Sequence, residues 1–346
     1  MAKRSRGARI RNWGDNKHSE YTHERRRFRG TEGRPKDLAP LNIVAFTDIE
    51  SNARVVSPYG ALVFVRRDGE EVLCRVADAL MQGKSSILAP GDNVLVVMED
   101  DQPVVQAVAP RTSKLSRPSV GKGTEQFIAA NVEQLVIVAA IAQPVFKQGI
   151  VDRYLIAAEV GGVKPVLCVN KMDLNIEIPD VVREYERLGL PVVYTSCKVQ
   201  SGLDSLRDIL RGKLSVLTGH SGVGKSSLIN ALNPGLDLST REVSRFNEKG
   251  QHTTTTSRLY EFDNIHIIDT PGVRQLGLWG VSLEEVRLYF PDLVELSGNC
   301  KFRDCTHLHE PGCAVRTAVE EQTFSALRYA SYCRIRASII DGRRSY

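Results

Sequence analysis

Apolar and polar positions alternate in two different ways along the chain. From residue 41 to residue 111, short apolar stretches are separated by turn-forming residues such as Pro58-Tyr59-Gly60 and Pro90-Gly91-Asp92, without helical periodicity. This pattern predicts short strands, which cover residues 41–46, 54–57, 61–66, 71–76, 93–98 and 103–109. Strands this short and closely spaced favour a small β-barrel such as an OB-fold. Many such barrels bind oligonucleotides, but a structural or protein-docking role fits this pattern nearly as well.

Beyond a polar connector at residues 112–123, apolar segments alternate with amphipathic ones. Strands are predicted at residues 134–140, 165–169, 191–195, 214–218, 258–262 and 265–269, and helices at 151–160, 181–188, 203–210 and 225–232. This alternation predicts a mostly parallel sheet with helices on both faces and a ligand at the carboxyl ends of its strands. From residue 278 onward the chain is predicted to be helical on either side of a cysteine-rich stretch.

The composition is that of a globular protein. The chain has 346 residues, of which 42% are hydrophobic and 25% charged, and this length allows two or three domains. No run of about 18 uncharged apolar residues occurs, and the arginine-rich N-terminus has no apolar block behind it. We therefore expect a cytoplasmic protein without a membrane partner.

Positive charge is concentrated near the N-terminus. Residues 1–37 contain 12 Lys/Arg and 5 Asp/Glu, whereas the other 309 residues contain 34 and 36. Trp13, Tyr21 and Phe28 lie among these arginines. Such a segment favours an extension that neutralises phosphates and stacks on unpaired bases. A solvated tail that only improves solubility is the alternative.

The stretch from Gly219 to Ser226 matches the pattern of a phosphate-binding loop. It follows the predicted strand 214–218 and opens onto the predicted helix 225–232, so glycine backbone N–H groups and a helix N-terminus would face an anion. We assign Lys225 to the β and γ phosphates and the Ser226 hydroxyl to Mg²⁺. The predicted nucleotide contacts here are Gly219, His220, Ser221, Gly222, Val223, Gly224, Lys225, Ser226 and Ser227.

Two further strand ends predict recognition of guanine. In Asn170-Lys171-Met172-Asp173, the Asp173 carboxylate can accept from the ring N–H and the exocyclic amine of guanine, a donor pair that adenine lacks on that edge. Asn170 and Lys171 would brace the loops and cover the base. Ser196-Cys197-Lys198 lies at the end of the next predicted strand and matches the SAK segment of GTPases, although this match is less specific. Its backbone N–H would recognise the guanine O6, and the stem of Lys198 would pack on the base.

A third strand end and the segment before it supply the remaining catalytic candidates. Asp269-Thr270-Pro271-Gly272 is the DxxG arrangement of GTPases, in which Asp269 holds a Mg²⁺-bound water and the Gly272 N–H meets the γ-phosphate. The Thr-rich segment 250–256 occupies the interval of a switch segment, and Thr254 is the predicted Mg²⁺ ligand.

Val273 stands where Ras-like enzymes place a glutamine that orients the attacking water. His252 is the candidate replacement and His220 the second, although each fits an ordinary polar loop residue as well. Slow intrinsic hydrolysis that a partner accelerates is therefore predicted.

The order of these motifs is permuted, because the base-recognition segments precede the phosphate loop. A circular permutation can preserve the pocket while moving the chain termini to another surface connection. After the DxxG segment the chain passes almost directly into its C-terminal part. We expect contacts with the γ-phosphate to reposition that part.

The cysteine-rich stretch predicts a closed metal site. Cys300, Cys305, His307 and Cys313 offer three thiolates and one imidazole, the ligand set of a tetrahedral structural Zn²⁺. His309 competes with His307 for the fourth position, and reduced core cysteines beside a surface histidine are the alternative. The other four cysteines are scattered, which argues against a disulfide framework.

The permuted order, with a barrel before it and a Cys/His cluster after it, resembles the RsgA (YjeQ) family of ribosome small subunit-dependent GTPases over about residues 41–335. The segments that carry the resemblance are 128–132, 170–173, 219–226, 250–255, 269–274 and 300–313. It implies a multidomain protein: an OB-fold barrel at 41–112, a circularly permuted α/β P-loop GTPase domain at 113–277 and a small α-helical zinc-binding domain at 278–346. The basic extension at 1–40 matches no family motif.

The resemblance also implies a biological role. It points to GTP hydrolysis in late maturation of the small ribosomal subunit, stimulated by that subunit, with GTP/GDP, Mg²⁺ and one structural Zn²⁺ as ligands. The subunit and its rRNA are the expected partners, other assembly factors are further candidates, and a monomer is expected. A GTP-sensing RNA- or ribosome-binding module with negligible hydrolysis is the alternative that Val273 leaves open.

Overall fold

The computed structural model describes residues 49–82, 85–118, 125–174, 176–236, 257–270 and 278–344. The basic extension, the predicted strand 41–46 and the candidates His252, Thr254 and Gly272 lie outside these ranges. Within them, none of the helices combines the length and the apolar character that crossing a bilayer requires.

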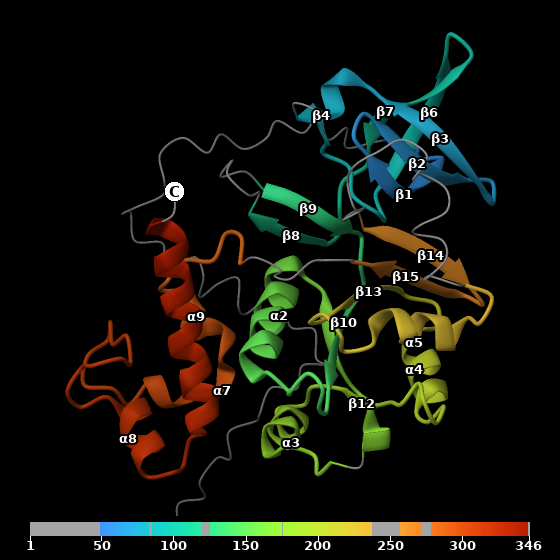
Figure 1. Ribbon diagram of the computed structural model, residues 1–346. Helices are drawn as coiled ribbons and strands as arrows, with labels where there is room; N and C mark the ends of the chain where they lie inside the picture. The colour runs from blue at the N-terminus through green and yellow to red at the C-terminus, as the bar shows by residue number, and fades with distance from the viewer. Residues whose placement is uncertain are drawn as a thin grey trace, which may run out of the picture.

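A closed five-stranded barrel forms the N-terminal part (Figure 1). Its strands follow one another in the order β1 (Ala53–Tyr59), β2 (Leu62–Arg67), β3 (Glu70–Val76), β7 (Gln102–Val108) and β6 (Asn93–Glu99). Alternate valines point inward, and Val55, Val63 and Val105 are fully buried. The turn η1 (Asp78–Leu80) and the short strands β4 (Met81–Gln82) and β5 (Ser85–Ser86) link β3 to β6. The predicted small barrel is confirmed.

The connector after the barrel differs from the prediction. Residues 114–118 form strand β8 (Lys114–Pro118), which pairs with β9 (Glu125–Ala130). Only Leu115 of β8 is buried, so a strand with one apolar side chain reads as polar loop in the sequence. The loop before β6 approaches the end of β9 closely, because a Cβ added at Gly91 would lie 2.2 Å from the carbonyl oxygen of Ala130.

The central sheet has six strands in the order β12-β11-β10-β13-β15-β14. Their bounds are β10 (Gln134–Ala140), β11 (Lys164–Asn170), β12 (Val192–Tyr194), β13 (Leu214–Thr218), β14 (Arg258–Phe262) and β15 (Ile265–Asp269). Only β14, at one edge, pairs antiparallel within this sheet. The predicted mostly parallel sheet is confirmed, and its carboxyl ends meet along one side.

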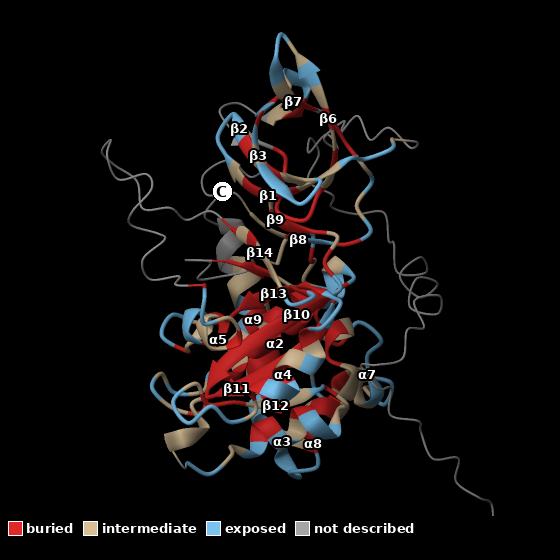
Figure 2. Ribbon diagram, turned by 90° about the vertical axis from the view of Figure 1, so that its right-hand side faces the viewer, coloured by how far each residue is buried: buried red, intermediate tan, exposed pale blue. Residues whose placement is uncertain are grey.

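Helices cover both faces of this sheet (Figure 2). Leu135 and Ile137 of β10 pack into one buried cluster with α2 (Gln148–Gly161) and α3 (Asp180–Arg187). Val136 and Val138 pack into a second cluster with α4 (Leu203–Leu210) and α5 (Lys225–Leu232). Because a strand alternates its side chains between two faces, the uninterrupted apolar run of β10 fills both cores.

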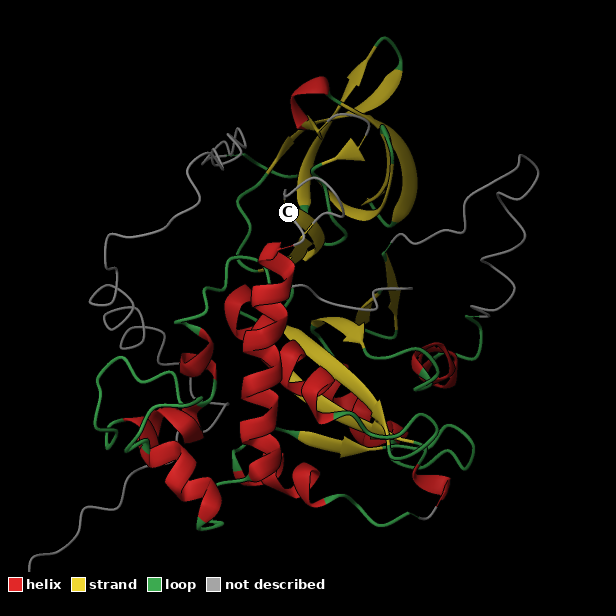
Figure 3. Cartoon of the chain, turned by 60° about the vertical axis from the view of Figure 1, so that its left-hand side comes forward, coloured by secondary structure: helices red, strands yellow, loops and turns green. Residues whose placement is uncertain are grey.

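The C-terminal part is helical and lies beside α2. It consists of η3 (Val286–Tyr289), α7 (Pro291–Ser297), α8 (Ala314–Glu320) and the long α9 (Ala326–Arg344). Figures 1 and 3 show α9 alongside α2. Ile156 of α2 is buried in the same cluster as Phe290 and Tyr332, so the C-terminal core includes one face of the helix next to it.

A buried arginine joins the C-terminal helices to the sheet domain. The Arg328 guanidinium, 3% exposed, donates to Asp152 on α2 and, at 2.9 and 3.0 Å, to Asp292 on α7. The hydroxyl of Tyr185 on α3 donates to the same Asp152 carboxylate at 2.9 Å. Burial raises the pKa of Asp152, and the charge of Arg328 opposes that rise. Arg328 therefore compensates two carboxylates drawn from separate elements.

We expect Arg328→Met to lower the free energy of unfolding by about 3–5 kcal/mol, because it leaves a buried carboxylate without its cation. Urea denaturation followed by circular dichroism measures the change. Arg316→Met is the control, since Arg316 lies at the surface of α8 with only a 4.0 Å ion pair to Glu320, and exposed pairs contribute about 0–1 kcal/mol. Equal losses in the two variants would contradict the role of Arg328.

Candidate nucleotide site and metal cluster

The loop between β13 and α5 has the backbone conformation of a phosphate-binding loop. Gly219, Gly222 and Gly224 all have positive φ, at 151°, 80° and 99°. A Cβ at Gly219 would lie 2.2 Å from the carbonyl oxygen of Val138, and one at Gly224 would lie 2.4 Å from Asn170 Nδ2. Only glycine fits these two positions, because the left-handed backbone and the close neighbours both exclude a side chain.

Four candidates for phosphate and magnesium binding lie near the start of α5. Lys225 Nζ donates to the carbonyl oxygens of Gly219 and His220 at 2.9 and 3.3 Å. Burial lowers the pKa of Lys225, and the negative charge of Asp269 acts to raise it, so the two side chains are electrostatic neighbours. Asp269 is 7% exposed at the end of β15. Ser226 and Ser227 are exposed in the first turn of α5.

The side chain of Asn170 joins three of the predicted motifs. Asn170 ends β11 and is 2% exposed. Its Nδ2 donates to the carbonyl oxygen of Val223 in the phosphate loop at 2.9 Å, and its Oδ1 accepts from Thr195 Oγ1 at 3.1 Å. Thr195, whose side-chain contact the sequence did not reveal, immediately precedes Ser196-Cys197-Lys198. The base-recognition segments and the phosphate loop therefore lie next to each other despite their permuted order.

Asp173 is held by a hydroxyl from the neighbouring segment. It lies in η2 (Met172–Leu174), and Ser196 Oγ donates to its Oδ1 at 2.6 Å. Ser196 is fully buried, and its hydroxyl also accepts from the N–H of Val199 at 3.3 Å. The sequence suggests a backbone role for residue 196. The structure adds a side-chain contact that fixes one oxygen of the predicted guanine-reading carboxylate.

The remaining base-recognition candidates flank this pair. Lys171 has a positive φ of 68°, and its Nζ donates to the carbonyl oxygen of Gln143. Cys197 is half-buried, with its Sγ 4.0 Å from Asn170 Oδ1. Lys198 is exposed. Lys171 and Cys197 thus lie next to Asn170, whereas the side chain of Lys198 is at the surface.

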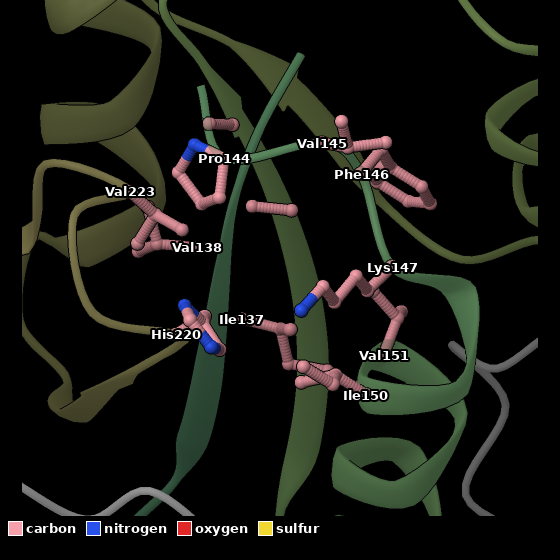
Figure 4. A pocket seen from close by; sticks show the side chains of 12 residues that line it. Ile137, Val138, Pro144, Val145, Phe146, Lys147, Ile150, Val151, His220 and Val223 are labelled. Carbon is pink, nitrogen blue, oxygen red and sulfur yellow. The ribbon is translucent and has the colours of Figure 1, made fainter. Parts of the chain in front are cut away.

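A loop that the sequence motifs did not indicate borders the phosphate loop. Figure 4 shows Pro144, Phe146 and Lys147, which follow β10, lining one pocket together with His220 and Val223. The ring Nδ1 of His220 lies 2.9 Å from the carbonyl oxygen of Ser221. Of the two histidines considered for orienting water, His220 therefore lines this pocket, and His252 lies outside the described residues.

The four predicted zinc ligands form one cluster. The ligand atoms of Cys300, Cys305, His307 and Cys313 all lie within 4.8 Å of one another. His307 Nδ1 is 3.5 Å from both Cys300 Sγ and Cys313 Sγ. Zn–S bonds of about 2.3 Å in a tetrahedron separate ligand atoms by roughly 3.5–3.8 Å, so the donor set fits zinc. His307 is fully buried, whereas His309 is exposed and is not part of this cluster.

Groups outside the ligand set hold this loop in place. The Glu310 carboxylate accepts from the backbone N–H groups of Thr306, Leu308 and His309 at 2.9, 3.1 and 3.2 Å. Burial acts to raise the pKa of Glu310, but hydrogen bonds from the Thr306 hydroxyl and from backbone N–H groups outweigh it and lower the pKa well below the usual range. From α9, the hydroxyl of Tyr329 donates to the carbonyl oxygen of His307 at 2.6 Å. No sequence pattern identified Glu310 or Tyr329.

Comparison with known proteins gives a consistent result. The RsgA GTPase family model matches residues 108–279. The small ribosomal subunit biogenesis GTPase RsgA of Sodalis glossinidius is 40% identical over 307 residues, covering 84% of this chain and 87% of that protein. The protein of the same name from Shewanella oneidensis is 37% identical over 310 residues, covering 86% of each chain.

Two solved structures are also similar. YjeQ from Thermotoga maritima has a TM-score of 0.61 at 32% identity, covering 84% of this chain and 98% of that one. YloQ, described as a circularly permuted GTPase, has a TM-score of 0.58 at 31% identity, covering 84% and 94%.

We expect Gly224→Ala to weaken GTP binding by at least about tenfold, because its Cβ would displace the Asn170 amide and leave buried polar groups unpaired. Gly222→Ala is the matched control, since it has a similar left-handed backbone but its nearest atom would be Pro144 Cδ at 3.8 Å. Fluorescent-nucleotide titration measures both. Equal losses would show that backbone strain, and not contact with Asn170, governs the effect.

Metal analysis of the purified chain should find about one zinc ion per molecule. His307→Ala should lose most of it, whereas His309→Ala should retain it, because only His307 shares the cysteine cluster. Zinc retained in the first variant and lost in the second would reverse the assignment. A metal content far below one in the unmodified chain would remove the site altogether.

Proposed function

The chain belongs to the RsgA GTPase family, and from this premise we propose that it hydrolyses GTP during late assembly of the small ribosomal subunit. Its relatives carry the name small ribosomal subunit biogenesis GTPase. The observation that carries the proposal is the Asn170 amide, which contacts the phosphate loop and the segment before Ser196 at once. One guanine nucleotide can then span the predicted base and phosphate segments.

The guanine base is read by Asp173. Its carboxylate accepts from the ring N–H and the exocyclic amine, and the Ser196 hydroxyl fixes its orientation through the 2.6 Å hydrogen bond. Lys171 and Lys198 cover the faces of the base, and the backbone of Ser196 and Cys197 meets the O6. Asn170 holds the two loops in register beside the nucleotide.

The triphosphate lies on the backbone of residues 219–224 and the first turn of α5. Lys225, now bonded to two loop carbonyls, exchanges them for β and γ phosphate oxygens. Mg²⁺, when bound, neutralises developing charge on the phosphates. The Ser226 hydroxyl, the Asp269 carboxylate through a water, and Thr254 are the oxygen ligands that the chain offers. Gly272 meets the γ-phosphate, and His252 orients the attacking water.

The cysteine cluster holds one structural Zn²⁺. Its four ligands leave no open position, so the ion stabilises the loop between α7 and α8 and takes no part in hydrolysis. In the proposed domain organisation, the barrel at 41–112 and the zinc unit at 278–346 lie on either side of the GTPase unit at 113–277 in the sequence. Through Tyr329 and Arg328, α9 connects the zinc loop to α2.

The partners follow from the relatives and from charge. We infer that the chain acts as a monomer in the cytoplasm and contacts the rRNA of the small subunit, with other assembly factors as further partners. The basic extension at 1–40 supplies phosphate contacts, because its charge is strongly positive while the rest of the chain is nearly neutral.

Phosphate release from GTP, measured with and without purified small ribosomal subunits, tests this proposal. We expect slow hydrolysis by the chain alone and a rate at least about tenfold higher with the subunit, as for GTPases whose partner completes the catalytic site. Lys225→Ala should abolish both rates and control for contaminating activity. A rate that subunits leave unchanged, while GTP still controls binding to them, would favour the GTP-sensing module instead.

A further inference from the structure

A cleft of about 450 Å³ lies between α2 and α9, outside the set of residues assigned to GTP or zinc. Lys147, Ile150 and Arg153 line it from the α2 side, and Arg334 and Ile335 line it from α9. Its volume is within the range of small-molecule sites. Three cations and no acidic side chain belong to the lining, so the cleft carries a local positive charge.

A buried amide in this cleft has no partner. Gln148 is 8% exposed, and neither its Nε2 nor its Oε1 makes a hydrogen bond. Arg153 Nε is likewise buried and unbonded, although its Nη2 donates to Ser338 Oγ at 3.1 Å. Buried polar groups are nearly always paired, because each unpaired group lowers the stability of the folded protein by about 1–3 kcal/mol. A ligand that offers both a donor and an acceptor would satisfy the Gln148 amide, which a change of side-chain rotamer would bring from its buried position to the cleft wall.

The helix that begins here adds to the positive potential. The 14-residue α2 starts at Gln148, with no side-chain cap and no acidic residue in its first turn. The free N–H groups at a helix N-terminus favour an anion. Lys147 and Arg334 are exposed at the rim of the cleft. Because no acidic residue lines the cleft, neither side chain has to break an ion pair with the lining in order to bind a phosphate.

We propose that the α2–α9 cleft binds one nucleotide unit. Its phosphate lies between Lys147, Arg334 and the N-terminus of α2, and its base edge pairs with the Gln148 amide. Ile150 and Ile335 provide the apolar surface against the base. Adenine is the favoured base, because a glutamine amide pairs with its adjacent donor and acceptor. The unit is either a free nucleotide or one residue of a single-stranded RNA.

The residues of this cleft differ from those proposed to bind GTP, but the cleft begins at Lys147, at the end of the loop beside the phosphate loop. Lys147 ends the loop that faces His220 and Val223 of the phosphate loop (Figure 4). None of the cleft residues has a role in the proposed GTP chemistry, so the two proposals can fail independently.

Photo-crosslinking tests the proposal with the full-length chain held in its GDP form. The probes are 8-azido-AMP and a short single-stranded RNA that contains 8-azidoadenosine, and labelled peptides are mapped by mass spectrometry. We expect labelling within residues 147–153 and 334–338. Gln148→Leu should reduce it by at least about fivefold and Arg334→Glu by at least about tenfold. Arg187→Glu is the matched control, an exposed arginine on α3, and should leave labelling unchanged.

Each result decides the matter. Labelling of the cleft by both probes, with AMP competing against the RNA, supports a site for free nucleotide; labelling by the RNA alone identifies an RNA residue as the occupant. Absence of labelling in both segments overturns the proposal. So does an equal effect of Arg334→Glu and Arg187→Glu. GTP hydrolysis measured on the same variants confirms that they are folded.

Discussion

The nucleotide site depends on one buried side-chain amide. Asn170 donates to the phosphate loop and accepts from Thr195, so segments that are up to 53 residues apart in sequence share a single side chain. In a buried environment such a bond is strong and an unpaired partner is costly. The amide therefore fixes the distance between the predicted base-recognition segments and the predicted phosphate loop. Chain order has no effect on this constraint, which explains how a permuted sequence retains the site.

Helix α2 links this site to the rest of the molecule. It starts after the loop that borders the phosphate loop, and it ends so close to β8 that a Cβ at Gly161 would lie 2.3 Å from the carbonyl oxygen of Lys114. Along its length, Ile156 enters the C-terminal core and Asp152 pairs with Arg328. Helix α2 thus contacts the loop that borders the phosphate loop, strand β8 and the C-terminal core.

The sequence identifies the segments that the fold brings together, because each of them carries a local pattern. The phosphate loop, the Asp173 segment and Asp269 each follow an apolar strand, and parallel strands place their carboxyl ends along one side of a sheet. The closed barrel follows from short strands separated by turns. By contrast, the sequence predicts a polar connector at β8, because only Leu115 among its residues is buried.

What could not be predicted depends on contacts between distant residues. The bond from Ser196 to Asp173 and the pairing of Arg328 with Asp152 and Asp292 are set by packing. Neither spacing nor composition reveals these contacts. Each becomes identifiable only when the fold brings its partner within hydrogen-bonding distance.

The central claim is that the segment at residue 173 and the loop at residue 225 act on one and the same nucleotide. Asp173→Asn tests it most directly, with hydrolysis of GTP and of xanthosine triphosphate measured side by side. The account predicts that this variant prefers the xanthine nucleotide, because the amide can donate to the oxygen that replaces the exocyclic amine of guanine. An unchanged preference for GTP would contradict the account.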